Sequence, residues 1–401
     1  FAKEFETKDI VLHRPAMWLF LAVACLIQQT TESEEFLRKQ HLNPQEFMTI
    51  NEIIQYWRYP SEEHEILTED GYYLQANRIP YGMHSSGKRG PRPVVLLVHG
   101  VLGEGRTWII NPPKNSLGFA LADAGYDVWI INTRGNSWSR RHKTLSIDQE
   151  AFWNFSFHEI AIYDIPATIN FILRKTKQEG LYFIGYSQGG TLGLIALSLR
   201  PQLAQKVKLF MTLAPIYTFV GTSGPAVLIL NLPDGLMKLI WGKKEFVFLS
   251  NKLKTLMAKF CSYPVMDEIC IQFMFLGSGR NPNNLNVVFK SRELKYFDYG
   301  SKNKAIYNTT TPPFYQIEDM VVPTAVWDGG HDIVINRKDI QLLLPRISNL
   351  VFHKNIPEWQ HGDFLWGLDP PKKLYPDIFY LMQNLEAILS LEVGQGAKKK
   401  H

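Results

Sequence analysis

The sequence predicts an α/β protein with a mostly parallel central sheet and helices on both faces. Along most of the 401 residues, short apolar runs typical of buried strands alternate with helix-compatible stretches, which is the pattern of parallel strands joined by helical crossovers. One such run, at 181–184, breaks onto a serine between glycines, and a helix-compatible stretch follows at once. The segment 215–310 lacks strand rhythm and is rich in Leu, Phe and Met. It therefore predicts an inserted helical cap.

The first elements expected along the chain are the two strands of a hairpin. Residues 62–67 and 72–77 flank Asp70-Gly71, a dipeptide that favours a tight turn between strands. Helices are expected between most of the later strands, notably at 158–175 and 191–199. The later strands are expected at 94–98, 128–132, 181–184, 207–213, 324–327 and 350–352.

The serine between glycines predicts a nucleophile elbow, the sharp strand-to-helix turn of the α/β-hydrolase fold. Gly185-Tyr186-Ser187-Gln188-Gly189 fits its Gly-x-Ser-x-Gly pattern, in which glycines allow the close approach that the turn demands. Such a turn lifts the hydroxyl of Ser187 out of the sheet and places it at a helix N-terminus. Free N–H groups there favour a developing negative charge.

A serine nucleophile needs two partners. Its hydroxyl is weak unless a histidine takes the proton and a carboxylate orients that histidine. In this fold the acid and then the histidine follow the serine in the chain, each on a loop after a later strand. Asp332 follows the strand expected at 324–327, and His361 follows the one at 350–352. We assign Asp332 as the orienting acid, His361 as the general base and Ser187 as the nucleophile.

Neighbouring residues offer alternatives to these two assignments. Asp328 lies nearer the strand end and is the alternative acid, although we expect it to cap the turn at Gly329-Gly330. His353 falls inside the strand pattern, where a packed or surface histidine is expected. We expect His331 to be a solvated loop residue and Asp363 to start the next helix.

The oxyanion of an acyl-transfer reaction needs two N–H donors, each typically worth ~3 kcal/mol at the transition state. One is expected from the backbone of Gln188, the residue after the nucleophile. The strand at 94–98 ends in His99-Gly100, and the backbone N–H of Val101 is the second candidate. A mere strand-ending turn is the alternative for His99-Gly100.

Longer segments resemble the acid lipase family, the group of lysosomal acid lipase and gastric lipase. They are LGFALADAGYDVW at 117–129, TRGN at 133–136, DIPAT at 164–168, NIPEW at 355–359 and the elbow with Tyr186. The resemblance spans roughly 44–389. It implies the α/β-hydrolase fold and hydrolysis of neutral lipid esters, triacylglycerols or cholesteryl esters. The implied residues are Ser187, Asp332 and His361, with Val101 and Gln188 as the oxyanion hole.

The resemblance also implies a domain division. The hydrolase core is expected at 44–214 and 311–390, the cap or lid at 215–310, and a basic tail at 391–401. One departure concerns the cap. After Asn286 the chain runs straight into 287–290, where the family would place a further cap segment, so an exon-sized block is missing. This affects the lid and the acyl pocket but not the catalytic residues.

The amino end predicts export. Residues 17–27 are eleven apolar residues, enough for a signal-peptide core and too few to span a bilayer. We expect a signal peptide at 17–33 and treat 1–16 as a spurious or alternative extension; a short buried helix is the alternative. The product is then secreted, or lumenal in the lysosome.

Cysteines and sequons fit that compartment. Cys261 and Cys270 lie in the expected cap and should pair in an oxidising lumen, a bond to which the resemblance also points; two free buried thiols are the alternative. Such a disulfide would stabilise the cap by about 2–3 kcal/mol. Asn154 and Asn308 begin glycosylation sequons. Asn308 lies in a polar run and is favoured, whereas Asn154 lies among aromatic residues and is expected to be buried.

Composition sets the remaining expectations. With 45% hydrophobic residues and a net charge of +5, the chain can bury one large core, and it shows no basic stripe with interleaved aromatics that would bind nucleic acid. We expect a monomer without metal, organic cofactor or transmembrane span, acting on a lipid ester at a lipid–water interface. The alternatives are a short-chain carboxylesterase and a hydrolase-fold protein impaired by its shortened cap.

Overall fold

The computed structural model describes residues 45, 48–83, 90–101, 103–218, 294–296 and 298–398, with side chains described as far as residue 389. The chain divides into two compact units, Phe1–Met48 and Thr49–His401, and the description below concerns the second. The expected extension, the signal peptide, Cys261, Cys270 and the shortening after Asn286 all lie outside the described residues.

Among the described residues of this unit, a mixed sheet of nine strands forms the centre. Its order is β1-β2-β4-β3-β6-β7-β8-β9, and β5 pairs with β2. The hairpin strands and β5 are antiparallel to their neighbours, while β4, β3, β6, β7, β8 and β9 run parallel. The strands are β1 (Glu62–Leu67), β2 (Tyr72–Ile79), β3 (Val94–Val98), β4 (Asp127–Ile131), β5 (Arg141–His142), β6 (Leu181–Tyr186), β7 (Val207–Leu213), β8 (Thr324–Gly329) and β9 (Leu350–Ile356). The predicted α/β-hydrolase sheet is confirmed.

Four strands, β2, β6, β8 and β9, extend beyond their expected ends. β8 continues through Asp328 and Gly329, because β9 also continues and pairs them with Asn355 and Ile356. The expectation that Asp328 caps a turn at Gly329-Gly330 is therefore wrong. Its backbone belongs to the parallel ladder instead.

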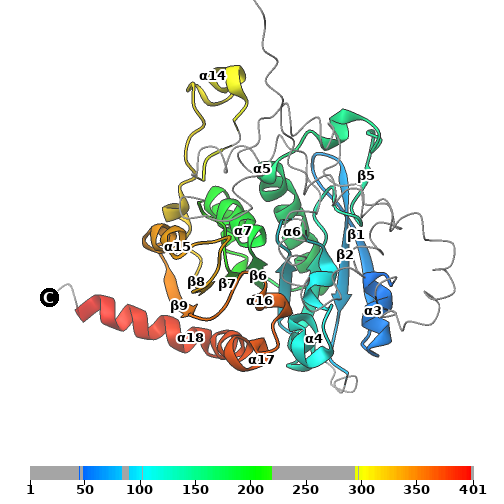
Figure 1. Ribbon diagram of the computed structural model, residues 1–401, viewed down its shortest axis with the longest axis vertical. Helices are drawn as coiled ribbons and strands as arrows, with labels where there is room; N and C mark the ends of the chain where they lie inside the picture. Colours follow the sequence, from blue (N-terminus) through cyan, green and yellow to red (C-terminus); the bar gives the residue numbers. More distant parts are fainter. Residues whose placement is uncertain are drawn as a thin grey trace, which may run out of the picture. The chain divides into compact units, whose positions relative to one another are not determined.

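Helices flank the sheet (Figure 1). They are α3 (Ile50–Tyr56), α4 (Leu117–Asp123), α5 (Phe157–Glu159), α6 (Ile165–Thr176), α7 (Gln188–Leu199), α8 (Pro201–Ala204), α14 (Asn303–Tyr307), α15 (Arg337–Leu343), α16 (Asp363–Trp366), α17 (Pro370–Lys373) and α18 (Tyr375–Lys398). The predicted helix at 158–175 is divided by a π-helical turn, Ile160–Asp164. Pro166 has no N–H to donate to the carbonyl four residues earlier, which explains the wider turn.

The two faces of the sheet carry different helices. Side chains of α6, α7 and α15 share one buried cluster with alternate strand residues such as Leu96 and Phe183. On the other face, the hydroxyl of Tyr182 in β6 donates to the carbonyl of Met382 in α18 at 2.9 Å. Figure 1 shows α7 and α18 on opposite sides of the strands. The predicted covering of both faces is confirmed.

The segment expected to form the cap leaves the core after β7 and returns before β8. At the departing end, the hydroxyl of Thr191 in α7 donates to the carbonyl of Ile216 at 2.5 Å. At the returning end, Nδ1 of His158 lies 2.6 Å from the hydroxyl of Tyr315. Residues 219–293 lie outside the description. Both described ends are thus held by side chains of the core.

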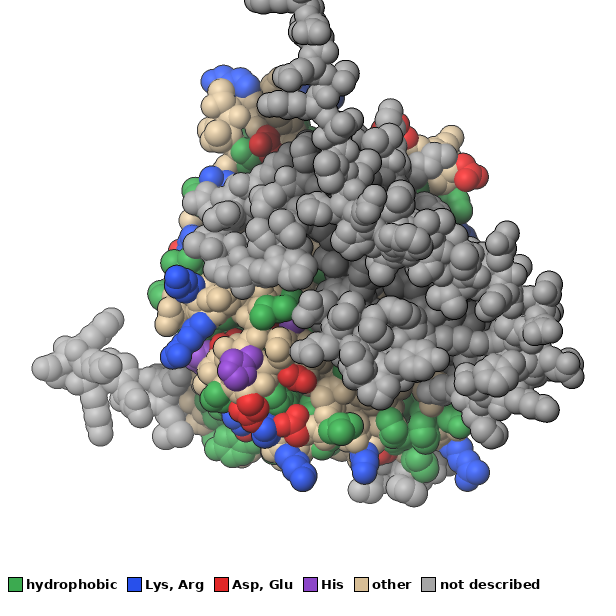
Figure 2. Space-filling model, viewed as in Figure 1, with side chains coloured by type: hydrophobic (Ala, Val, Ile, Leu, Met, Phe, Trp, Pro, Cys, Tyr) green, Lys and Arg blue, Asp and Glu red, His purple; other side chains and the backbone are tan. Residues whose placement is uncertain are grey.

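Charged side chains are mixed on the described surface. Figure 2 shows Lys and Arg interspersed with Asp and Glu on the visible part of this face. Among the described helices, none is long and apolar enough to cross a membrane.

Candidate active site

The turn between β6 and α7 has the geometry expected of a nucleophile elbow. Ser187 has φ 53° and ψ −118°, a left-handed conformation that costs a non-glycine residue of order 1–3 kcal/mol. A Cβ added to Gly185 would lie 2.5 Å from the backbone of Gly189, and one added to Gly189 would lie 2.2 Å from the carbonyl oxygen of Val98. Glycine is therefore required at both positions, and the surrounding contacts hold Ser187 in its strained conformation.

Ser187, His361 and Asp332 come together although they lie far apart in the sequence. Nε2 of His361 lies 2.9 Å from Oγ of Ser187, and Nδ1 lies 2.7 Å from Oδ2 of Asp332. The three residues are 2%, 4% and 5% exposed, respectively. An ionised carboxylate can only accept, so Nδ1–H donates to Asp332, and Nε2 is left to accept the hydroxyl proton of Ser187.

The carboxylate of Asp332 is itself held in place. Its second oxygen, Oδ1, accepts the backbone N–H groups of Val334 and Ile335, both at 2.8 Å. The two oxygens thus have separate partners, one in the loop after β8 and one on His361. This division fixes the plane of the carboxylate relative to the imidazole.

The alternative acid has other partners. Asp328 is buried, and its Oδ1 lies 2.6 Å from Nε2 of His353, while its Oδ2 accepts from Nδ2 of Asn355 at 2.5 Å. These contacts join β8 to β9. His353 and His331 are both exposed, and α16 begins at Asp363 as expected.

Two glycines allow the loop that carries Asp332 to approach the loop that carries His361. A Cβ at Gly329 would lie 2.3 Å from the carbonyl oxygen of Trp359, and one at Gly330 would lie 2.3 Å from that of Pro357. Sequence reasoning treated this pair only as a turn. The contact joins residues about thirty apart, and no local pattern could reveal it.

The loop after β3 packs against the elbow. A Cβ at Gly100 would lie 3.1 Å from Cβ of Ser187. His99 is 1% exposed, and its Nε2 accepts the backbone N–H of Thr133 at 3.2 Å. Its Nδ1 therefore carries the proton and donates to the carbonyl of Gly100 at 2.8 Å. Because C=O and N–H point in opposite directions across a trans peptide, this bond also fixes the direction of the Val101 N–H.

Gln188 is the other residue expected to carry a donor. It is the first residue of α7, and the first N–H groups of a helix have no acceptor within it. Gln188 and Val101 thus come from two different elements that both meet Ser187. The anchoring of Gly100 by His99 was missed at the sequence level, where His99-Gly100 indicated only that an oxyanion donor follows the strand.

The segments at 133–136 and 164–168 meet at a buried ion pair. It lies beside the loop after β3, because Thr133 is the residue that donates to His99. The side chain of Arg134 is fully buried, and its Nε donates to Oδ1 of Asp164 at 2.7 Å. Its Nη2 donates to Oδ1 of Asp70, in the turn of the β1–β2 hairpin, at 2.8 Å. The guanidinium carbon lies 4.1 Å from the ring centroid of Tyr72. This cluster joins the hairpin, the loop after β4 and the start of α6.

Two further expectations concern surface chemistry. Asn308 is exposed, and so is Asn154, although its neighbours Trp153 and Phe155 are buried. The expectation of a buried Asn154 is wrong: the residue directly follows the 3-10 turn Glu150–Trp153, which buries Phe152 and Trp153 and leaves Asn154 exposed. Within the described residues, no group of three or more His, Cys, Asp or Glu side chains is placed to hold a metal ion.

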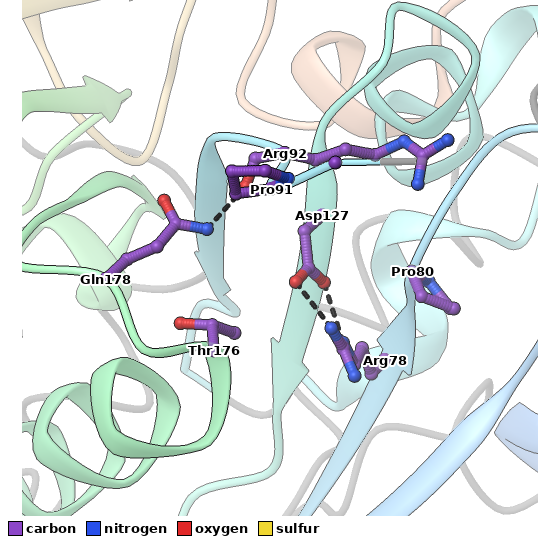
Figure 3. Close-up of a pocket in the computed structure, with 8 residues that line it drawn as sticks. Arg78, Pro80, Pro91, Arg92, Asp127, Thr176 and Gln178 are labelled. Carbon is purple, nitrogen blue, oxygen red and sulfur yellow. Dashed lines mark hydrogen bonds and ion pairs between the residues drawn. The ribbon is translucent and has the colours of Figure 1, made fainter. Parts of the chain in front are cut away.

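A separate polar pocket lies at the amino ends of β3 and β4 (Figure 3). Its space of about 380 Å³ includes open solvent, and it is lined by Arg78, Pro80, Gly90, Pro91, Arg92, Asp127, Thr176 and Gln178. Arg78 is fully engaged there, with Asp127 at 2.7 Å and Glu62 at 3.0 Å. These pairs raise the pKa of Arg78 against the effect of burial. Ser187 follows the carboxyl end of β6, at the other edge of the sheet.

The chain is similar to hydrolase families and to individual lipases. A model described as alpha/beta hydrolase fold matches residues 93–368, and one described as a partial alpha/beta-hydrolase lipase region matches residues 50–112. Lipase member M of Homo sapiens is 48% identical over 407 residues, covering 95% of this chain and 96% of that protein. Lysosomal acid lipase/cholesteryl ester hydrolase of Homo sapiens is 45% identical over 391 residues, covering 91% and 98%. Lipase member N of Mus musculus is 42% identical over 396 residues, covering 92% and 99%.

Proposed function

This chain belongs to the acid lipase family, and on that premise we propose that it is a serine hydrolase that cleaves carboxylic ester bonds of lipids. One observation carries the proposal: the hydrogen-bonded series from Ser187 through His361 to Asp332, at a strained strand-to-helix turn. This arrangement matches the needs of nucleophilic catalysis by serine, which requires a base within hydrogen-bonding reach and a third group that orients the base.

The proposed reaction has two halves. Oγ of Ser187 attacks the ester carbonyl carbon while Nε2 of His361 takes its proton, and Asp332 stabilises the resulting imidazolium. The tetrahedral intermediate then collapses, and His361 gives the proton to the leaving alcohol. In the second half, water attacks the acyl-enzyme with His361 again as the base, and the carboxylic acid is released.

The backbone N–H groups of Val101 and Gln188 are the proposed oxyanion donors. The bond from His99 to the carbonyl of Gly100 supports this assignment, because it orients the next peptide N–H before any substrate arrives. Donors fixed in advance need no reorganisation when charge develops, and each is typically worth ~3 kcal/mol at the transition state.

We further propose neutral lipid esters, triacylglycerol or cholesteryl ester, as the substrates. The name of the human relative, lysosomal acid lipase/cholesteryl ester hydrolase, supports this class. A short-chain carboxylesterase is the rival that the shortened cap sequence after Asn286 suggests. Initial hydrolysis rates across esters of increasing acyl length distinguish the two: a lipase keeps its rate on long chains presented as an emulsion, whereas an esterase acts only on short, dissolved esters.

Export is part of the same proposal. The lumen of the secretory pathway or the lysosome suits a Cys261–Cys270 disulfide and glycans on Asn308 and Asn154, whose exposure is compatible with modification. Glycosidase treatment of protein secreted from cultured cells should increase its electrophoretic mobility. Asn308→Gln should remove one part of that shift.

The decisive test is labelling by a fluorophosphonate, which reacts with an activated serine. Folded protein should become labelled at Ser187, and Ser187→Ala should not. Absence of label on folded wild-type protein would remove the enzyme proposal and leave the impaired hydrolase-fold alternative.

A further inference from the structure

Tyr186 contacts three parts of the site at once. It is the last residue of β6, where it pairs with Leu213, and it directly precedes Ser187. Its hydroxyl donates to the backbone carbonyl of His361 at 2.9 Å. Its ring centroid lies 5.1 Å from that of the His361 imidazole, with 38° between the planes. The same ring contacts Gly100, whose added Cβ would lie 3.1 Å from its Cδ1.

We propose that Tyr186 is a positioning residue for His361, holding Nε2 of the imidazole toward Oγ of Ser187. The inference rests on the proposed function, in which His361 is the general base. Tyr186 does not touch the reacting atoms through its hydroxyl. It acts on the backbone of the base and on the flank of its ring.

The two ends of this contact lie in different kinds of element, a loop and a central strand. His361 belongs to a loop between β9 and α16, and the loop has few backbone hydrogen bonds of its own, such as Trp359 N–H to the carbonyl of Ile356 at 3.1 Å. Tyr186 belongs to a central strand paired on both sides. Because Ser187 follows it directly, the anchor of the base and the nucleophile share one rigid element. Asp332 holds the far side of the imidazole, and Tyr186 gives the loop a direct connection to the residue next to Ser187.

The contact does not depend on pH over the working range of an esterase. Tyr186 is fully enclosed, and burial raises the pKa of its phenol well above the ordinary value, with the charges of Asp332 and Asp363 acting in the same direction. The phenol stays protonated, so the hydroxyl remains a donor. Its acceptor is a carbonyl, which does not titrate.

The same strand offers a matched control. Tyr182 also lies in β6, is also buried, and its hydroxyl also donates to a backbone carbonyl at 2.9 Å, that of Met382. That carbonyl belongs to α18. Tyr182 shares a face of β6 with Tyr186 but lies four residues nearer the amino end of the strand, away from Ser187. Tyr182→Phe thus removes an equivalent hydrogen bond without touching the site.

The experiment compares Tyr186→Phe with Tyr182→Phe and wild type in the full chain. Active sites are first titrated to completion with a fluorophosphonate, and the labelling rate constant and kcat on a soluble nitrophenyl ester are then expressed per titrated site. For Tyr186→Phe we expect full titration, an unchanged KM, and both rate constants lowered by about three- to tenfold, the worth of one hydrogen bond. Tyr182→Phe should keep wild-type rates per site.

The outcomes separate the inference from its premise. Rates of Tyr186→Phe within twofold of those of Tyr182→Phe would overturn the positioning role, and a lowered titre with normal rates per site would show a merely structural role. No labelling of wild type would overturn the proposed function itself. If Tyr186→Phe does not fold, two other variants at position 186 are compared. One carries 4-aminophenylalanine, which keeps a hydrogen-bond donor, and the other carries 4-fluorophenylalanine, which lacks one. Equal rates for that pair would overturn the inference, and a slower fluoro variant would support it.

Discussion

Asp332→Asn tests the orienting role of the acid, and the structure predicts how the substitution acts. Oδ1 of Asp332 accepts two backbone N–H groups at 2.8 Å, those of Val334 and Ile335. Only the oxygen of an asparagine amide can satisfy them, so its NH2 group must face Nδ1 of His361. Nδ1 then becomes an acceptor and the proton moves to Nε2, which faces Ser187 and can no longer take its proton.

The expected loss is large. A wrong tautomer in a serine triad lowers kcat by about 10⁴-fold, which is about 5 kcal/mol of transition-state stabilisation. The assay is kcat on a soluble ester per folded molecule, together with the fluorophosphonate labelling rate. Both should fall together, while the melting temperature changes little because the backbone N–H groups keep their acceptor.

Asp328→Asn is the matched control for this substitution. Asp328 is also a buried carboxylate beside a histidine, but its partners are His353 and Asn355. The activity of Asp328→Asn should stay within about twofold of that of wild type. Asp328 takes no part in the hydrogen bonds that join Ser187, His361 and Asp332. If Asp332→Asn kept more than a tenth of wild-type kcat, or if Asp328→Asn lost as much, the assignment of the acid would be refuted.

Three further predictions follow from the surroundings of the elbow. Gly189→Ala places a Cβ 2.2 Å from the carbonyl oxygen of Val98, so urea unfolding should show a loss of about 1–3 kcal/mol, and an unchanged midpoint would contradict the packing argument. His99→Leu removes one of two donors to the carbonyl of Gly100, the other being the N–H of Gly103 at 3.1 Å. The direction of the Val101 N–H is then less firmly fixed, so kcat should fall about 10- to 100-fold, less than or comparable to removal of one oxyanion donor, with KM unchanged in steady-state assays. A purely KM effect would argue against Val101 as a donor. Arg134→Met leaves Asp164 buried without its cation, and chemical denaturation should reveal a loss of about 3–5 kcal/mol, whereas a variant as stable as wild type would show that the carboxyl is readily neutralised.

Much of the site could be predicted because its residues follow strands. Apolar runs locate the strands, and side chains at the carboxyl ends of parallel strands meet at one edge of the sheet. Ser187, Asp332 and His361 each follow such a run, and the structure brings all three within hydrogen-bonding distance. Predicting their proximity required only the order of the elements and the direction of the strands.

The errors concern features that depend on distant partners. The end of β8 could not be predicted, because Asp328 is polar and stays in the strand only through its pairing with β9. Asn154 is exposed between two buried aromatic residues, and the composition of such a segment does not show which of its residues face solvent. The contacts of Gly329 and Tyr186 with the loop of His361 join residues that are far apart in the sequence, and periodicity carries no information about them.

The anchoring of the two ends of the cap segment has a consequence for how such enzymes diversify. Thr191 and His158 hold the departing and returning chain by contacts that involve only core residues and the ends themselves, and the pairing of β7 with β8 begins with Phe210 beside Thr324. The pairing of β7 with β8 therefore does not depend on the residues between those ends. Exon loss, duplication or laboratory grafting between those ends should therefore leave the strand order and the contacts among Ser187, His361 and Asp332 unchanged.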